Sequence, residues 1–63
     1  MKSKIGELRR KNGLTQQYVA SKINVSYQRL SEWEHDKGMP KYDKAYELAK
    51  IFNVSMEELY ERK

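Results

Sequence analysis

One stretch, Gln16–His35, constrains the fold of this 63-residue chain more than any other part of the sequence. In its first half, Val19 and Ile23 lie four residues apart, which is the spacing of a buried stripe on a helix. In its second half, Leu30 and Trp33 form another apolar stripe, and polar side chains occupy the opposite face. The stretch therefore predicts two short amphipathic helices with a tight turn between them.

The turn and the outer face of the second helix point to a binding function. Asn24 tolerates the left-handed backbone conformation that a tight helix ending needs, and Ser26 is placed to cap the next helix. The outer face carries side chains that can hydrogen-bond to base edges, namely Gln28, Ser31, Glu32 and His35. Such a stripe suits the major groove of DNA, so the pattern predicts a helix-turn-helix motif over about residues 16–35.

Five segments stand in an order and spacing that are typical of one protein family. They are Gly13–Gln16, Asn24–Ser26, Ser31–Glu34, Pro40 and Asn53–Tyr60. Together they resemble the Cro/C1-type helix-turn-helix domain of phage repressors and small bacterial regulators, over roughly residues 5–60. The resemblance implies the lambda repressor-like DNA-binding fold. The family usually has glycine at the positions of Asn24, Asp36 and Asn53, and these replacements adopt positive φ at modest cost.

The apolar residues outside the motif predict three further helices, which gives a compact all-α bundle of five helices. A first helix is expected over about residues 3–12, and a fourth helix carries an apolar stripe over residues 45–52. Ser55 and Glu58 form a capping-box pattern that opens a fifth helix, from which Leu59 points back to the core. No strand is expected.

Composition limits the functions that are open to the chain. Sixty-three residues make a single domain, residues 1–63, whose core is too small to enclose an ordinary catalytic cavity. Cysteine is absent and only one histidine is present, so no metal site is expected. The sequence contains neither a nucleophile–base pair nor a glycine-rich loop that could bind phosphate, so it gives no indication of an enzyme. The sequence has no apolar run long enough to span a membrane and no signal peptide, so we expect a cytoplasmic protein. We also expect no cofactor and no small-molecule ligand.

The charge distribution favours an anionic partner. The net charge is +4, and residues 1–13 hold five cations and one acid, a local balance of +4. Residues 42–63 hold four cations and five acids, a local balance of −1. The molecule should therefore present a preferred face to a polyanion, and double-stranded DNA is the expected partner.

The residues expected to contact DNA fall into two sets. The base readers are Tyr27, Gln28, Arg29, Ser31 and Glu32. Gln28 is the best candidate, because it lies at the centre of the stripe and its amide can bind adenine with two hydrogen bonds. Arg29 lies on the flank, where it reaches guanine or the backbone. The expected backbone contacts are Arg9, Gln16, Gln17, Ser26, His35, Lys37 and Lys41.

The resemblance implies an ion pair and a dimer. In the phage relatives a partly buried ion pair joins the first and third helices, and here it would join Arg9 to Glu34. Family dimers pair near the last helix, in the region that holds Tyr46, Ile51, Val54, Met56 and Tyr60. A homodimer would hold two recognition helices about one DNA turn apart, on an operator-like inverted repeat. The expected function is therefore a sequence-specific transcriptional regulator, most simply a repressor.

Two alternatives stand beside these expectations. The same fold could serve as a protein-interaction module, such as an antitoxin or an accessory subunit, with DNA binding secondary. Few residues follow Leu59, whereas an antitoxin usually carries a partner-binding tail, so this alternative is disfavoured. Trp33 could stack on a base, but its place beside Leu30 predicts a core residue.

Overall fold

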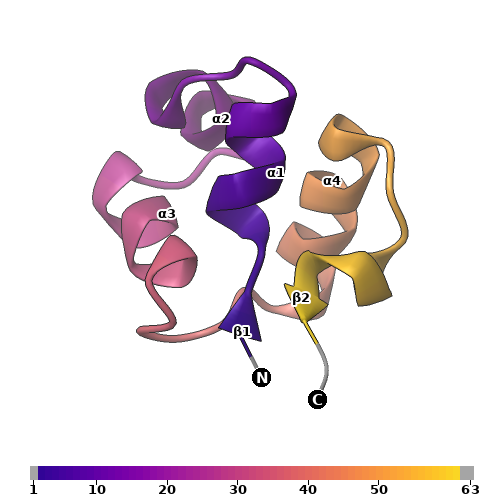
Figure 1. Cartoon of the computed structure of the whole chain (residues 1–63). Helices are drawn as coiled ribbons and strands as arrows, with labels where there is room; N and C mark the ends of the chain where they lie inside the picture. Colours follow the sequence, from indigo (N-terminus) through magenta and orange to yellow (C-terminus); the bar gives the residue numbers. More distant parts are fainter. Residues whose placement is uncertain (1, 62–63) are drawn as a thin grey trace.

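A computed structural model describes residues 2–61 of the chain (Figure 1). These residues form four α-helices: α1 (Ile5–Lys11), α2 (Gln16–Lys22), α3 (Tyr27–Glu34) and α4 (Tyr42–Phe52). They are accompanied by a 3₁₀-helix, η1 (Met56–Leu59), and two short strands, β1 (Lys2–Ser3) and β2 (Tyr60–Glu61). In Figure 1, α1 lies between the α2–α3 pair on one side and α4 on the other, with the strands below it.

The expectation of five helices and no strand is wrong. The segment after Ser55 forms only a 3₁₀ turn of four residues, because Tyr60 already has extended backbone angles (φ −134°, ψ 142°). β1 and β2 pair antiparallel, with Lys2 opposite Glu61 and Ser3 opposite Tyr60. Strands of two residues show no alternation in the sequence, and their partners come from opposite ends of the chain. The fold is therefore mostly helical with a small antiparallel sheet.

Side chains cap the helices where the sequence predicted them. The hydroxyl of Thr15 opens α2 and that of Ser26 opens α3, each by accepting a hydrogen bond at 3.0 Å from the N–H three residues further on. At η1 the Glu58 carboxylate accepts hydrogen bonds from both the backbone N–H and the hydroxyl of Ser55, at 3.1 Å. These contacts satisfy polar groups that each helix start leaves without a partner inside the helix.

Three non-glycine residues take the left-handed conformation at helix ends. Asn24 and Asp36 have φ of 62°, and Asn53 has φ of 59°, which confirms the positive φ expected at these three positions. Asp36 has a second role, because its Oδ1 accepts a hydrogen bond of 2.7 Å from the backbone N–H of Ser3. The turn after α3 is therefore tied directly to β1.

The apolar stripes of the helices meet in the core. Its buried side chains are Ile5, Leu8, Val19, Ala20, Ile23, Leu30, Trp33, Leu48, Ala49, Phe52 and Leu59. These include the inward residues predicted for each helix except Ala45, which is partly buried against the core. Trp33 is only 5% exposed, so its assignment to the core is confirmed. With Leu30, it fixes which face of α3 points away from the molecule.

The Ser55–Glu58 contact predicts an acid-sensitive contribution to stability. The two hydrogen bonds from Ser55, first the backbone bond and then the hydroxyl bond, hold the pKa of Glu58 below its ordinary value. A lowered pKa contributes stability that is full above the unfolded-state value of about 4.3 and is lost as pH falls through the folded-state pKa. Urea denaturation of the parent and of Glu58→Gln should therefore differ at pH 7 and converge once the pH falls below the lowered pKa of Glu58. An equal difference at both pH values would contradict a role for the ionised carboxylate.

Candidate nucleic-acid interface

The outward face of α3 carries hydrogen-bonding side chains over its whole length. Gln28, Ser31, Glu32 and His35, with Lys37 from the following turn, line a shallow groove of about 390 Å³. Gln28 and Glu32 are exposed, while Leu30 and Trp33 hold the opposite face of the helix in the core. The structure thus brings together the predicted stripe as one polar surface on a helix that is fixed from behind.

One ring nitrogen of His35 is hydrogen-bonded to the backbone at the end of α3. His35 Nδ1 lies 2.8 Å from the carbonyl oxygen of Ser31, which can only accept, so Nδ1 carries the hydrogen of this bond. The neutral ring then presents Nε2 as an acceptor, and the doubly protonated ring presents a donor there. His35 can therefore contact either a donor or a phosphate oxygen from an oriented ring.

The start of α2 lies beside the end of α3. Gln17 is exposed, whereas Gln16 is half-buried and its Nε2 donates a 3.0 Å hydrogen bond to Glu34 Oε1. One N–H of the Gln16 amide is thus used within the protein, and the other is available to a phosphate. Sequence reasoning missed this bond, because nothing local indicates which side chain faces Gln16 across the helix pair.

Arg9 and Glu34 form the ion pair that the family resemblance implied. Arg9 Nε lies 2.7 Å from Glu34 Oε2, and Arg9 Nη2 donates to Oε1 at 3.3 Å. Arg9 Nη1 also donates to the carbonyl of Leu14 at 2.8 Å. The side chains of Arg9 and Glu34 are 12% and 4% exposed. With Gln16, this network joins α1, the loop before α2, α2 itself and α3.

A glycine makes room for the network. A Cβ at Gly6 would lie 3.0 Å from Glu34 Oε1, which is closer than such contacts normally allow. The absence of a side chain on α1 at this point lets the Glu34 carboxylate approach the helix and meet Arg9. Gly6 therefore allows α1 and α3 to lie close together at this point.

We expect Arg9→Met to lower the free energy of unfolding by about 3 kcal/mol, the lower end of the range for breaking a buried ion pair. The substitution removes three hydrogen bonds and leaves a buried carboxylate without its cation. Urea denaturation measures the loss. Arg10→Met, a change of the same kind at an exposed position of α1, should have little effect.

The double variant Arg9→Met/Glu34→Met separates the pair from general packing. It should recover much of the lost stability, because no charge then remains buried. If Arg9→Met alone unfolded at the same urea concentration as the parent, the ion pair would contribute nothing to stability.

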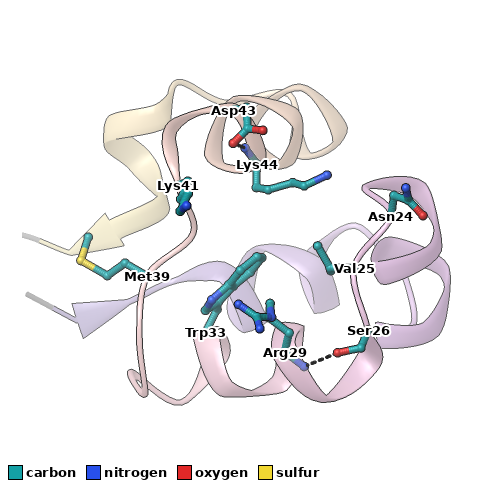
Figure 2. A pocket seen from close by; sticks show the side chains of 9 residues that line it. All are labelled: Asn24, Val25, Ser26, Arg29, Trp33, Met39, Lys41, Asp43 and Lys44. Carbon is teal, nitrogen blue, oxygen red and sulfur yellow. Dashed lines mark hydrogen bonds between the residues drawn. The ribbon is translucent and has the colours of Figure 1, made fainter.

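A second groove runs between α3 and the start of α4 (Figure 2). Arg29 and Trp33 line it from α3, and Lys41 and Lys44 line it from the start of α4. Lys44 was not predicted as a site residue. Its Nζ donates a 2.6 Å hydrogen bond to the carbonyl of Ile23, at the end of α2. The carbonyl groups at the end of a helix have no partner inside the helix and attract a cation. This attraction explains the position of the Lys44 side chain.

The residues predicted for a dimer interface differ in exposure. Tyr46 is exposed, Met56 is half-buried, and Ile51 and Val54 are partly buried against the core. Tyr60 packs against the core in β2, and its buried hydroxyl has no hydrogen-bond partner within residues 2–61. Burial, followed by the charge of Asp36, raises the pKa of Tyr60.

Residues 2–61 contain neither a metal-binding cluster nor a membrane-spanning helix. No group of three or more potential ligands (His, Cys, Asp or Glu) there could hold a metal ion. None of the helices in this range has the length and apolar character needed to cross a membrane.

Known proteins share this chain's sequence pattern. The model of the helix-turn-helix family HTH_3 matches residues 5–59. An uncharacterized HTH-type transcriptional regulator of Archaeoglobus fulgidus is 35% identical over 60 residues, which cover 95% of this chain and 86% of that protein. The HTH-type transcriptional regulator ImmR of Bacillus subtilis and the HTH-type transcriptional activator BcrR of Enterococcus faecalis are each 36% identical over 56 residues. Those residues cover 89% of this chain, 44% of ImmR and 28% of BcrR.

A solved structure shares the fold. The crystal structure of a transcriptional regulator from Listeria innocua matches with a TM-score of 0.78 and 22% sequence identity. The match covers 100% of this chain and 64% of that one.

Proposed function

The chain belongs to the helix-turn-helix family HTH_3, of the Cro/C1 type, and we propose that it is a sequence-specific double-stranded DNA-binding regulator of transcription. The observation that carries the proposal is the outward face of α3, where exposed hydrogen-bonding side chains stand on a helix anchored by buried Leu30 and Trp33. A rigid helix with such a face is what recognition in the major groove requires. We propose no catalytic activity.

In this proposal α3 is the recognition helix and lies in the major groove. Gln28 donates to N7 and accepts from N6 of an adenine, and Glu32 accepts from N4 of a cytosine. Tyr27, at the start of the helix, contacts a thymine methyl group or a phosphate. Backbone contacts come from both sides of α3, from Gln17 at the start of α2 and from Lys37 after α3. The ion pair behind α3 holds these elements in a fixed relative orientation.

Gln28 and Lys37 should separate base recognition from phosphate binding. Gln28→Ala should weaken binding to the preferred site by about 1–3 kcal/mol and relax the choice of base at one position per half-site. Lys37→Ala should weaken binding to all sequences alike and reduce the salt dependence by about one unit per half-site. Affinities on a panel of single-base variants of the site measure both effects. Equal losses on every sequence from Gln28→Ala would show that α3 docks without base recognition at that position.

We further propose that the protein binds as a homodimer to an inverted repeat. The interface would use the surface of Tyr46, Ile51, Val54, Met56 and Tyr60. Two copies of α3 would then lie about 34–36 Å apart, and the second tethered copy would supply affinity that one small module lacks. Occupation of such an operator would make the protein a repressor acting on DNA inside the cell.

Selection of bound sequences from a random DNA pool tests the proposal most directly. The expected result is an enriched half-site that recurs in inverted orientation at a spacing of about one or two DNA turns. A single unrepeated half-site would argue for a monomer and against the dimer. No enrichment, together with binding that ignores salt, would favour a protein-interaction module. A reporter with the selected operator at a promoter then distinguishes repression from activation.

A further inference from the structure

The groove between α3 and the start of α4 is lined by residues that have no part in the proposed recognition of bases (Figure 2). Its volume is about 380 Å³. The apolar part of its lining consists of Trp33, Val25 and Met39, and the charged part of Arg29, Lys41, Lys44 and Asp43. Three cations and one acid leave a local balance of +2. The Asp43 Oδ1 accepts a hydrogen bond of 2.9 Å from the backbone N–H of Lys44, which engages part of the single acid.

The neighbouring groove along α3 has a different character. It is lined by Gln28, Ser31, Glu32, His35 and Lys37, so its one lysine and one glutamate balance. α3 lines both grooves but shares no lining residue between them. One side of the helix is therefore polar with balanced lysine and glutamate charges, and the other is cationic with an apolar floor.

We propose that the α3–α4 groove holds one sugar-phosphate unit of the DNA backbone, and that Arg29 binds phosphate rather than a base. The proposal rests on the proposed function, since it names how the same helix is held in the major groove. A nucleotide backbone combines an anionic phosphate with the apolar carbons of deoxyribose. The cationic rim and the apolar floor of this groove match the two parts.

Arg29 and Lys41 are the two cations of the groove whose side chains have no ion-pair partner within residues 2–61. The donors of the Arg29 guanidinium are therefore available to phosphate oxygens. Arg29 follows Gln28 by one residue, which turns its side chain about 100° around α3 from the centre of the polar groove. This rotation places Arg29 on the side of Trp33 and away from Gln28.

The two lysines of the groove have different roles. Lys44 donates to the carbonyl of Ile23, and its Nζ lies 3.9 Å from Glu47 Oε1, so its charge is fixed in place and partly balanced outside the groove. Lys41 is exposed at the rim of the groove and directly precedes α4, so its ammonium group can reach a phosphate. Trp33 forms the floor while it remains part of the core, so it positions the sugar through shape.

The test measures the affinity of the full chain for its selected DNA site and for a scrambled duplex of equal length, across a series of salt concentrations. Arg29→Ala should weaken both complexes by the same factor and lower the salt slope by about one unit per bound chain. Arg29→Lys should restore the slope, because a phosphate accepts any positioned cation, whereas bidentate binding to guanine needs the guanidinium. Lys22→Ala, the same charge change at the exposed end of α2 and outside both grooves, is the matched control and should leave the slope unchanged.

Each other outcome has a distinct meaning. A relaxed preference at one base pair that Arg29→Lys does not rescue would show that Arg29 recognises a base, and would overturn the proposal. An unchanged affinity and slope in Arg29→Ala would show that the groove does not touch DNA. If the wild-type chain itself showed neither sequence preference nor salt dependence, the proposed function would fail, independently of Arg29.

A second measurement separates the DNA backbone from a free anion. The chain has one tryptophan, so DNA in the groove should change the fluorescence of Trp33. Inorganic phosphate at about 1 mM and constant ionic strength should neither change this fluorescence nor displace DNA, because a single free anion lacks the sugar and the rest of the duplex. Saturation of the groove by phosphate alone at this concentration would make it a free-anion site and would contradict its assignment to the backbone.

Discussion

Replacement of Trp33 by alanine is expected to lower the free energy of unfolding by about 3–5 kcal/mol, the usual loss for a buried aromatic side chain. Trp33 is 5% exposed and packs in the core between α3 and the rest of the domain. A domain of this size has a total stability of about 3–9 kcal/mol, so the loss is comparable with the whole. We expect Trp33→Ala to be largely unfolded at 37 °C, as followed by circular dichroism during thermal denaturation.

Two controls on the same helix make this result specific. Trp33→Phe keeps an apolar ring in the core and should lose less stability than the alanine variant. Tyr27→Ala also removes an aromatic ring from α3, but Tyr27 is 55% exposed, so the melting temperature should change little. If Trp33→Ala melted like the parent and lost only DNA binding, the indole would act by stacking on a base, and its assignment to the core would be wrong.

The affinity for DNA is expected to fall by about 10³–10⁵-fold between 50 and 200 mM salt, if a dimer makes roughly six to ten phosphate contacts. Each contact by a lysine or arginine releases counterions from DNA, and added salt opposes that release. Lys37 and Lys41 are exposed beside α3, and the exposed Arg29 lies on its flank, so several cations of each copy can reach the backbone. Fluorescence anisotropy with a labelled duplex at several salt concentrations gives the slope.

The same experiment on a scrambled duplex is the internal control. Its affinity should be lower, but its slope should be similar, because phosphates are present in every sequence. A nearly flat salt response on both duplexes would exclude DNA as the main ligand. The protein-interaction module would then become the better hypothesis.

The sequence alone predicts most of the helical framework, because the signals involved are local. Thr15 and Ser26 bond to N–H groups three residues away, and the apolar stripes repeat within each helix. Asn24, Asp36 and Asn53 take positive φ, which Asn and Asp adopt more readily than other residues with a side chain. Residue type indicated the turn at Asn24, and the family resemblance indicated those at Asp36 and Asn53. The polar outer face of α3 followed from the same periodicity, since Leu30 and Trp33 define the buried face.

Contacts between distant segments were decided only by the tertiary structure. β1 and β2 pair across nearly the whole length of the chain, and strands of two residues leave no pattern to detect. The bond from Gln16 to Glu34 and the bond from Lys44 to Ile23 depend on how the helices pack. The family resemblance named Arg9 and Glu34, but not the Gly6 backbone that lets them meet.

In the candidate site, too, some residues could be predicted from the sequence, and others were brought together only by the tertiary structure. Residue type and helical spacing identified Gln28, Ser31, Glu32 and His35 as one surface, because all four lie on a single helix. The sequence placed Arg29 on the flank of that surface but could not show what it faces. Its neighbours Lys41 and Lys44 come from another helix start, after a loop whose path is set by packing. Local periodicity determines the face of a helix, whereas the groove beside it depends on the position of a second element.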